Sequence, residues 1–298
     1  MRSRLLLDAS SLMYRAFHSV PRTVADADGA PVNAVHGYLE FTNRLIRDRT
    51  PHEVWHAFDH DWRPAPRVAI YAGYKAARPD EPEELTPQFG ILRRVLAVSG
   101  MRVAEAPGWE AEDAIGTLTA TAPRGTRSDV VTGDRDLIQL VRDPEVRVLF
   151  TVRGVTELRV LDEAGVLAAY GVPASRYAEF AILRGDPSDG LPGVRGVGEK
   201  TARTLVREYP SLEAMVLDAS RAVPRGETLR RSKTLHAAVR AAAEYLDLMR
   251  DVVSIRTDLE VSSEGGARDD AALDALADRH RLGGPLRRLR EALDAPGG

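Results

Sequence analysis

Short apolar runs that end in an acidic residue recur through the first half of the chain. The stretches RLLLDAS, EVWHAFD and DVVTGDRD end on Asp8, on Asp59, and on Asp134 and Asp136. Two further runs, MRVAEA and EVRVLF, have the same strand-like character. Helical periodicity lies between the runs, at about 32–48, 86–99, 110–121 and 135–142. This alternation predicts an α/β fold with a parallel sheet covered by helices on both faces.

Beyond about residue 160 the strand signals fade and helical patterns dominate. Asp162 and Ser211 stand where helix N-caps are expected. We expect one longer helix over about 226–250 and a helical tail over about 266–295. The sequence therefore predicts a helical region that packs on the α/β core.

Residues 60–85 interrupt the alternation of strands and helices with a proline-rich insertion, which we expect to be partly helical or mobile. Its basic and aromatic residues are Arg63, Arg67, Lys75, Arg78, Tyr71 and Tyr74. Phosphate contact and base stacking by such residues suit a single nucleic-acid strand. The alternative is a solvated loop whose tyrosines pack on the core.

Nine carboxylates are candidates for one site at the carboxyl edge of the sheet, where working groups of parallel sheets gather. They are Asp8, Asp59, Glu110, Glu112, Asp113, Asp134, Asp136, Asp186 and Asp189. Nine such groups in one cleft would repel, so some must protonate or cations must neutralise them. An all-oxygen set suits Mg²⁺ or Mn²⁺, and two such ions can clamp a scissile phosphate. The competing interpretation for each acid is a helix cap or a solvated helix face, with Asp113, Glu112 and Asp136 as the first candidates.

A glycine turn in LPGVRGVGEKTARTL resembles a helix–hairpin–helix, which holds a DNA backbone without reading sequence. Its backbone N–H groups and the following helix start can seat a phosphate. The residues concerned are Gly193, Arg195, Gly196, Gly198, Lys200 and Arg203. A tight turn with no ligand is the plainer alternative.

Composition adds three constraints to this picture. The 298 residues carry a net charge of −3, but without the nine candidate acids the rest of the chain is positive. No cysteine is present, which excludes a disulfide scaffold and a thiolate metal site. No signal-peptide core or apolar run of membrane length occurs, so we expect a soluble cytoplasmic protein without membrane contact.

These motifs together resemble the bacterial 5′-3′ exonuclease/flap endonuclease family, which includes the N-terminal nuclease domain of DNA polymerase I and its stand-alone relatives. The resemblance rests on LLLDASSLMYRAFH, FDHDWRPAPR, YAGYKAARP, WEAEDAIGTL, TGDRDLIQL and LRGDPSDGLPGVRGVGEKTA, in the family's order. It implies a PIN-like core, a helical arch over 60–85, and a helix-three-turn-helix at 185–207. We accordingly expect residues 1–178 to form the nuclease core. Residues 179–298 would form a helical DNA-binding region whose C-terminal helices pack on that core.

The resemblance also assigns roles to individual residues. It places the acids up to Asp113 in a first metal group, and Asp134, Asp136, Asp186 and Asp189 in a second. It places Lys75 and Arg78 on the scissile phosphate, and Tyr14 and Arg15 near the cleft. It further implies a monovalent cation such as K⁺ held by backbone carbonyls around 193–198. Two positions depart from the family pattern: Glu112 replaces an aspartate, and Gly190 replaces an asparagine, for which we expect a looser turn.

The predicted function is a divalent-metal-dependent, structure-selective 5′ nuclease acting near single-strand/duplex junctions in DNA replication and repair. One ion would lower the pKa of the attacking water and the second would stabilise the leaving 3′ oxygen, with Lys75, Arg78, Asp134 and Asp186 as the catalytic residues. Expected partners are flapped or branched duplex DNA with a 5′ single strand, RNA-containing 5′ ends and a DNA polymerase, for a monomeric protein. The alternatives are a non-catalytic DNA-junction binder of the same fold and a metal-dependent phosphatase.

Overall fold

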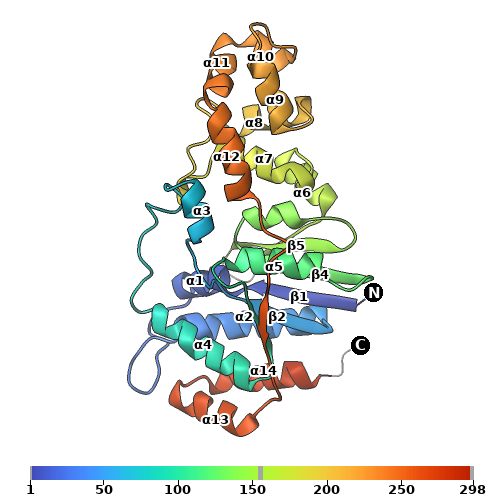
Figure 1. Ribbon diagram of the computed structural model, residues 1–298. Helices are drawn as coiled ribbons and strands as arrows, with labels where there is room; N and C mark the ends of the chain where they lie inside the picture. Colours follow the sequence, from blue (N-terminus) through green and yellow to red (C-terminus); the bar gives the residue numbers. More distant parts are fainter. Residues whose placement is uncertain (1, 154–156, 296–298) are drawn as a thin grey trace.

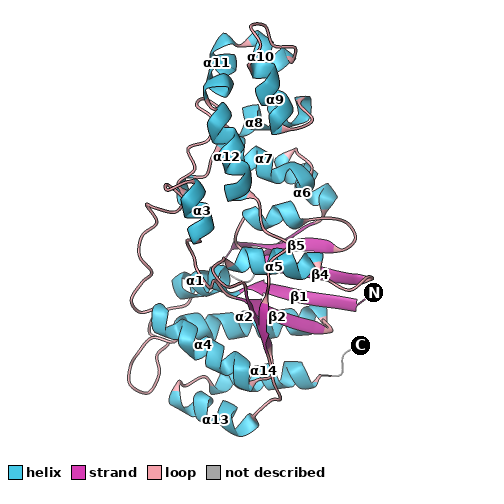
Figure 2. Cartoon of the chain, in the orientation of Figure 1, coloured by secondary structure: helices cyan, strands magenta, loops and turns pink. Residues whose placement is uncertain are grey.

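The computed structural model of the protein describes residues 2–153 and 157–295. Within these residues one seven-stranded sheet has the order β6-β5-β4-β1-β2-β3-β7 (Figures 1 and 2). The strands are β1 (Arg2–Asp8), β2 (Glu53–Ala57), β3 (Arg102–Glu105), β4 (Thr126–Thr132), β5 (Val146–Arg153), β6 (Glu157–Leu161) and β7 (Ser262–Glu264). The five central strands pair in parallel, as the alternating pattern predicts.

The two edge strands run antiparallel to their neighbours and were not predicted. Strand β7 has three exposed residues and no apolar pattern, so only its pairing with β3 makes it a strand. Strand β6 pairs back on β5 and is exposed along most of its length. Edge strands of this kind lack the buried apolar face that makes a strand visible in sequence.

Helices cover both faces of the sheet, and strand β1 contributes side chains to the buried layer on each face. Leu5 and Leu7 enter one buried cluster and Leu6 enters the other, because successive side chains alternate across a strand. The first face carries α1 (Ala9–Ser19), α2 (Asn33–Arg49), α4 (Thr86–Val98), α13 (Asp270–Arg279) and α14 (Gly283–Asp294). The second carries α5 (Ala111–Ala120), the 3₁₀ turn η1 (Asp136–Leu140), α6 (Glu163–Tyr170) and α7 (Tyr177–Arg184).

Five further helices form a lobe that stacks on α7 and extends away from the sheet (Figure 1). They are α8 (Glu199–Glu208), α9 (Leu212–Ala219), α10 (Glu227–Arg231), α11 (Lys233–Ala241) and α12 (Ala243–Val253). The single helix expected over about 226–250 is therefore wrong. Ser232 breaks it, because its side chain accepts the N–H of Leu235 and caps α11, and a second break follows at Ala242. The caps at Asp162 and Ser211 and the helical tail are confirmed.

The insertion over 60–85 is partly helical, as expected. It contains one short helix, α3 (Ala65–Ile70), followed by turns and irregular chain. Two further 3₁₀ turns are η2 (Ala174–Arg176) and η3 (Pro187–Asp189). No helix among the described residues is long and apolar enough to cross a bilayer.

The strand order reverses at β1, which lies between β4 and β2. Chain order runs outward from β1 through β2 and β3, and then returns to β4 on its other side. A crevice forms where neighbouring crossover connections leave in opposite directions, and ligands of open α/β sheets bind there. Asp8 ends β1 at this point, and Asp134 follows β4 closely. The topology therefore places the candidate acids at the favoured site of such a sheet.

Gly116 provides a stability test of how the lobe is joined to the core. A Cβ there would collide with the carbonyl oxygen of Arg256 and the side chain of Ile255, in the segment that leaves α12. We expect Gly116→Ala to destabilise the protein by about 1–3 kcal/mol through overpacking. Gly90→Ala, in α4, meets only an ordinary contact with Arg94 and should change stability by less than about 1 kcal/mol. Urea denaturation measures both, and equal midpoints would contradict this account.

Candidate active site

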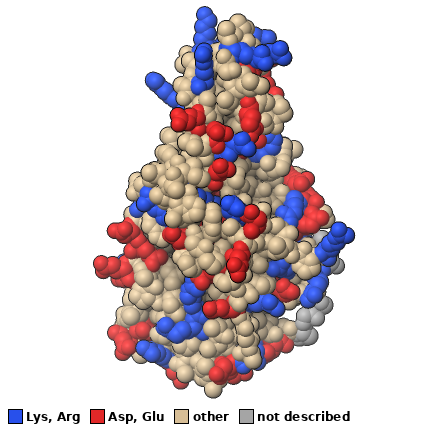
Figure 3. Space-filling model, in the orientation of Figure 1, with Lys and Arg blue, Asp and Glu red and all other residues tan. Residues whose placement is uncertain are grey.

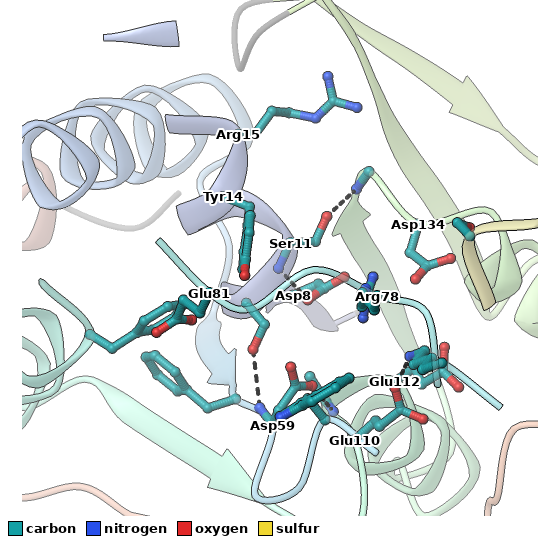
Figure 4. A pocket seen from close by; sticks show the side chains of 18 of the residues that line it. Asp8, Ser11, Tyr14, Arg15, Asp59, Arg78, Glu81, Glu110, Glu112 and Asp134 are labelled. Carbon is teal, nitrogen blue, oxygen red and sulfur yellow. Dashed lines mark hydrogen bonds and ion pairs between the residues drawn. The ribbon is translucent and has the colours of Figure 1, made fainter. Parts of the chain in front are cut away.

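A cleft of about 1020 Å³ opens beyond the carboxyl ends of the central strands. Six of the nine predicted acids line it: Asp8, Asp59, Glu110, Glu112, Asp134 and Asp186. Figure 4 labels Asp8, Asp59, Glu110, Glu112 and Asp134 around the hollow, together with Tyr14 and Arg15 of α1 and Arg78 of the insertion. The sequence prediction that the strand-end acids meet at one edge is therefore confirmed for Asp8, Asp59 and Asp134.

Backbone and hydroxyl donors hold the strand-end carboxylates in place. Asp8 accepts the N–H of Ser11 at 3.1 Å and the hydroxyl of Thr132 at 2.6 Å. Asp59 accepts the N–H of Ala111, at the start of α5, at 2.8 Å. These bonds fix the carboxylates before any ligand arrives. Thr132 was missed in the sequence, although its position directly before the Gly133-Asp134 turn was a usable signal.

A first acidic group lies at the start of α5. Oxygen atoms of Glu110, Glu112 and Asp113 come within 4.8 Å of one another. Asp113 is fully buried and closes a capping box with the N–H of Glu110, at 3.4 Å. It does not line the cleft, so the capping interpretation describes its geometry better than the metal-ligand one.

One buried guanidinium neutralises this first group. Arg67 of α3 is 1% exposed and forms ion pairs with Glu110, with Glu112 at 3.0 Å and with Asp113 at 2.8 Å. It also donates to the carbonyl of Ser254, just past α12, at 3.4 Å. Burial opposes the charged form of Arg67, but the surrounding carboxylates raise its pKa. Arg67 therefore ties the insertion, the acidic helix and the lobe together.

The prediction that Arg67 and Tyr74 contact nucleic acid does not hold in this structure. Tyr74 is 3% exposed, and its hydroxyl donates to Glu110 at 2.7 Å. Both side chains point inward because the carboxylates of α5 offer partners that solvent-facing positions lack. Tyr71 is half-buried, and its hydroxyl donates to the carbonyl of Gly190 at 3.2 Å. The alternative in which the tyrosines pack on the core is the observed one.

A second acidic group joins α5 to the turn after β4. Oxygen atoms of Glu112, Asp134 and Asp136 lie within 4.8 Å of one another, so Glu112 is common to both groups. Asp134 accepts the N–H of Asp136 at 2.9 Å, which brings the two carboxyls together. Burial, and then the charge of Asp134, raise the pKa of Asp136 well above its usual range. Asp136 and Asp189 lie behind the cleft wall rather than on it.

Burial shifts the proton affinity of several carboxyls in the same direction. It raises the pKa of Asp8 to about 7, with Asp59 and Asp134 adding to the effect and Thr132 opposing it. It raises the pKa of Asp189 to about 6, although the cation of Lys75 opposes the shift. It also raises the pKa of Glu112 well above the usual range, against the effect of Arg67. Protons and cations therefore compete for these carboxylates.

Lys75 lies inside the cleft wall rather than on an open arch. It is 4% exposed and pairs with Glu110, and its own N–H donates to the carbonyl of Asp189 at 2.9 Å. Its backbone has the left-handed φ of 51°. Gly190, at φ 74°, makes this approach possible, because a Cβ there would collide with the carbonyl oxygen of Gly73. The glycine therefore tightens the contact between insertion and turn, where we expected a looser turn. Arg78 is exposed beside the cleft.

The glycine turn presents an exposed tip beyond α7. Arg195, Gly196, Gly198 and Lys200 are exposed, while Val194 and Val197 anchor the turn in the core. Gly193 is half-buried, and its N–H donates to the hydroxyl of Tyr245 on α12 at 3.0 Å. Arg203 is engaged elsewhere, donating to the carbonyl of Tyr170 and pairing with Glu199, both at 2.8 Å. Its predicted role at a phosphate is therefore not supported by its contacts.

The donor set fits hard divalent cations. The acids that line the cleft offer only carboxylate oxygens, which Mg²⁺, Mn²⁺ and Ca²⁺ prefer. Those of Asp8, Asp59 and Asp134 have few protein donors apart from the bonds that orient them. The nearest internal cations, Arg67 and Lys75, serve the Glu110 side of the cleft. Asp186 pairs with Arg184 at 3.6 Å, whereas Asp8 and Asp134 form no ion pair among the described residues, so added positive charge is most needed beside these two.

Two family models and several known proteins match this chain. The profile for the 5′-3′ exonuclease N-terminal resolvase-like domain matches residues 3–171, and that for its C-terminal SAM fold matches residues 172–271. The sequence division between 178 and 179 lies slightly later and stays a prediction. A Streptomyces coelicolor 5′-3′ exonuclease is 43% identical, with 98% of this chain and all of that protein covered. The DNA polymerase I of Mycobacterium bovis is 42% identical over 85% of this chain but only 28% of its own length.

A solved structure shares the fold at low sequence identity. The bacteriophage T5 D15 flap endonuclease, in a pseudo-enzyme-product complex with DNA and metal ions, has a TM-score of 0.63 and 15% identity. The alignment covers 98% of each chain. At this identity the likeness concerns the fold alone.

Replacing Arg67 tests whether one cation holds the acidic group together. Arg67→Met should lower the stability of the metal-free protein by about 3–5 kcal/mol near pH 7, because it leaves buried carboxylates unpaired. The loss should shrink toward pH 5, where the carboxyls can protonate. Arg47→Met, an exposed position on α2 with no ion pair among the described residues, is the matched control and should change stability by less than about 0.5 kcal/mol. Urea denaturation at both pH values measures this, and equal losses in the two variants would sink the assignment.

A second prediction concerns stabilisation by divalent ions as a function of pH. Because the folded pKa values of Asp8 and Asp189 are raised, the metal-free native state binds more protons than the unfolded chain between about pH 4 and 7. Its stability therefore falls as pH rises through this window, and an ion must displace these protons to bind. The gain in melting temperature on adding Mg²⁺ should be small at about pH 5.5 and larger at about pH 8. Asp8→Asn should weaken this dependence, and Na⁺ at equal ionic strength is the control. A gain independent of pH would contradict it.

Proposed function

Because the chain belongs to the 5′-3′ exonuclease family, we propose that it is a structure-selective nuclease that hydrolyses DNA phosphodiesters near single-strand/duplex junctions. The observation that carries this proposal is the cleft itself. Eight carboxylates line it, six of which were predicted from the sequence, and basic residues of α1 and of the insertion line the same hollow.

We infer that the cofactor is Mg²⁺ or Mn²⁺, in two or more ions. The cleft acids Asp8, Asp59, Glu110, Glu112, Asp134 and Asp186 would hold the ions, and Asp136 and Asp189 would support them from behind. Bound there, the ions supply an activated water and charge stabilisation for the leaving oxygen. The carboxylates' own part is to give up their protons and to remain fixed by the donors that already orient them.

The basic residues would act on the substrate rather than on the ions. Arg78 is exposed beside the acids and can contact a phosphate directly. Lys75 is paired with Glu110 and must leave this ion pair before it can contact a phosphate. Binding of a metal ion by Glu110 would free Lys75 for that contact. Tyr14 and Arg15 line the cleft from α1 and would contact the strand that enters it.

On the lobe side, we propose that the exposed glycine turn seats the phosphates of the duplex next to the junction. Backbone N–H groups of Gly196 and Gly198 and the cations of Arg195 and Lys200 are the available donors. A K⁺ ion held by carbonyls of 193–198 would add to this seat. The expected substrates include 5′ flaps and RNA-containing 5′ ends. A monomeric state, a cytoplasmic location and association with a DNA polymerase remain predictions from the sequence.

The decisive experiment uses a labelled 5′-flap substrate with Mg²⁺, with and without a chelator. Asp134→Asn and Asp186→Asn should each lower the cleavage rate by more than about 100-fold, because each removes a negative metal ligand from the cleft. Flap binding should survive in both variants. Asp80→Asn, an exposed acid on the same cleft, is the control and should stay within about twofold of wild type.

Each other outcome identifies a rival. Binding without cleavage in the wild type would indicate a non-catalytic junction binder. Hydrolysis of a small chromogenic phosphomonoester in place of the flap would indicate a phosphatase. Undiminished cleavage in both Asp variants would refute the metal assignment.

A further inference from the structure

The far end of the helical lobe carries a concentration of positive charge outside the cleft and the glycine turn. Residues 221–240 contain six lysines and arginines and one acidic residue, Glu227. All six basic side chains are exposed. Figure 3 shows Lys and Arg gathered at this end, where Figure 1 places α10 and α11.

Four of these cations have no ion-pair partner in the described chain. Arg221 pairs with Asp218 and Arg231 pairs with Glu227. The other four are Arg225, Arg230, Lys233 and Arg240, which we call the distal basic surface. Unpaired cations grouped in this way repel one another, so an anionic partner would stabilise the group.

Packing beneath the surface orders the backbone that carries these cations. Asp218 accepts the N–H groups of Arg225 and Gly226, both at 2.9 Å, and the hydroxyl of Tyr209 at 2.8 Å, so the loop before α10 is built around one carboxylate. On α11, Val239 is buried, whereas Lys233 and Arg240, seven residues apart, share the exposed face. The surface is thus an ordered part of the lobe.

Helix α12 gives the distance between this surface and the cleft. Its first residues follow α11 directly. Just beyond its other end, Ser254 contacts Arg67, and the N–H of Arg256 donates to Asp113 at 2.9 Å. Eleven helical residues span about 16 Å, and α11 adds up to about 14 Å. The distal basic surface therefore lies roughly 16–30 Å from the acids, which corresponds to about 5–9 base pairs at 3.4 Å each.

We propose that the distal basic surface binds the phosphate backbone of the substrate's duplex arm, beyond the part held by the glycine turn. This inference rests on the proposed nuclease function. The stretch 221–240 has no Phe, Tyr or Trp to stack on a base, and His236 is tied to the carbonyl of Ala219 at 2.8 Å. Cations without aromatics suit the outside of a duplex rather than a single strand.

The test compares two charge-matched variants on two substrates. The surface variant carries Arg225→Gln, Arg230→Gln, Lys233→Gln and Arg240→Gln. The control variant carries Arg47→Gln, Arg124→Gln, Arg159→Gln and Arg279→Gln, exposed positions of the sheet-bearing part that also lack ion pairs in the described chain. The substrates are 5′ flaps on hairpin-closed duplex arms of about 5 and about 18 base pairs. Binding is measured by fluorescence anisotropy with a chelator present, over a range of salt concentrations.

The surface variant should bind the long-arm substrate at least about tenfold more weakly than the wild type does. For the same substrate, the magnitude of the slope of log K against log salt should fall by about 2–3. On the short arm the wild type and the surface variant should bind equally, and both should cleave it equally once Mg²⁺ is added. Equal losses in the control variant, or a loss on both arms, would overturn the proposal. If the wild type bound neither arm, the nuclease assignment itself would fail, and cleavage of the short arm by the surface variant shows that it has folded.

Discussion

Mutual repulsion among carboxylates at one edge of a parallel sheet is the constraint on which the rest of this structure depends. The strand order brings Asp8, Asp59 and Asp134 to the same edge, and the start of α5 adds Glu110 and Glu112. In a partly buried cleft such charges cannot coexist without protons or cations. The raised pKa of Asp8 and the ion pairs of Arg67 show both remedies in one site.

The internal cations also determine how the segments are assembled. Arg67 comes from the insertion, its carboxylate partners come from α5, and the carbonyl of Ser254 comes from the end of the lobe. Lys75 adds a second tie from the insertion, to Glu110 and to the backbone of Asp189. Ion pairs and backbone hydrogen bonds around the same acids thus hold together segments that lie far apart in the sequence. A change of charge in the cleft should therefore alter the contacts that hold the insertion and the base of the lobe.

Sequence reasoning succeeded where a residue's role depends on its own strand or helix. The apolar runs before Asp8, Asp59 and Asp134 locate the central strands, and an acid that ends a parallel strand has only one edge to occupy. It failed where a role depends on a partner far along the chain. Arg67 looks like a surface cation until Glu110, 43 residues away, is placed beside it. Gly190 looks like a loosened turn until the backbone of Gly73 approaches it.

Glu112 shows how one added methylene can serve this arrangement. Its carboxylate pairs with Arg67 at 3.0 Å and still lies in one cluster with Asp134 and Asp136. An aspartate at this position would hold its carboxylate one methylene closer to the helix. The glutamate therefore links the acids neutralised by the protein's own cation to those that need an added one. Burial raises the pKa of Glu112 well above its usual range and the neighbouring acids add to this shift, whereas the charge of Arg67 opposes it.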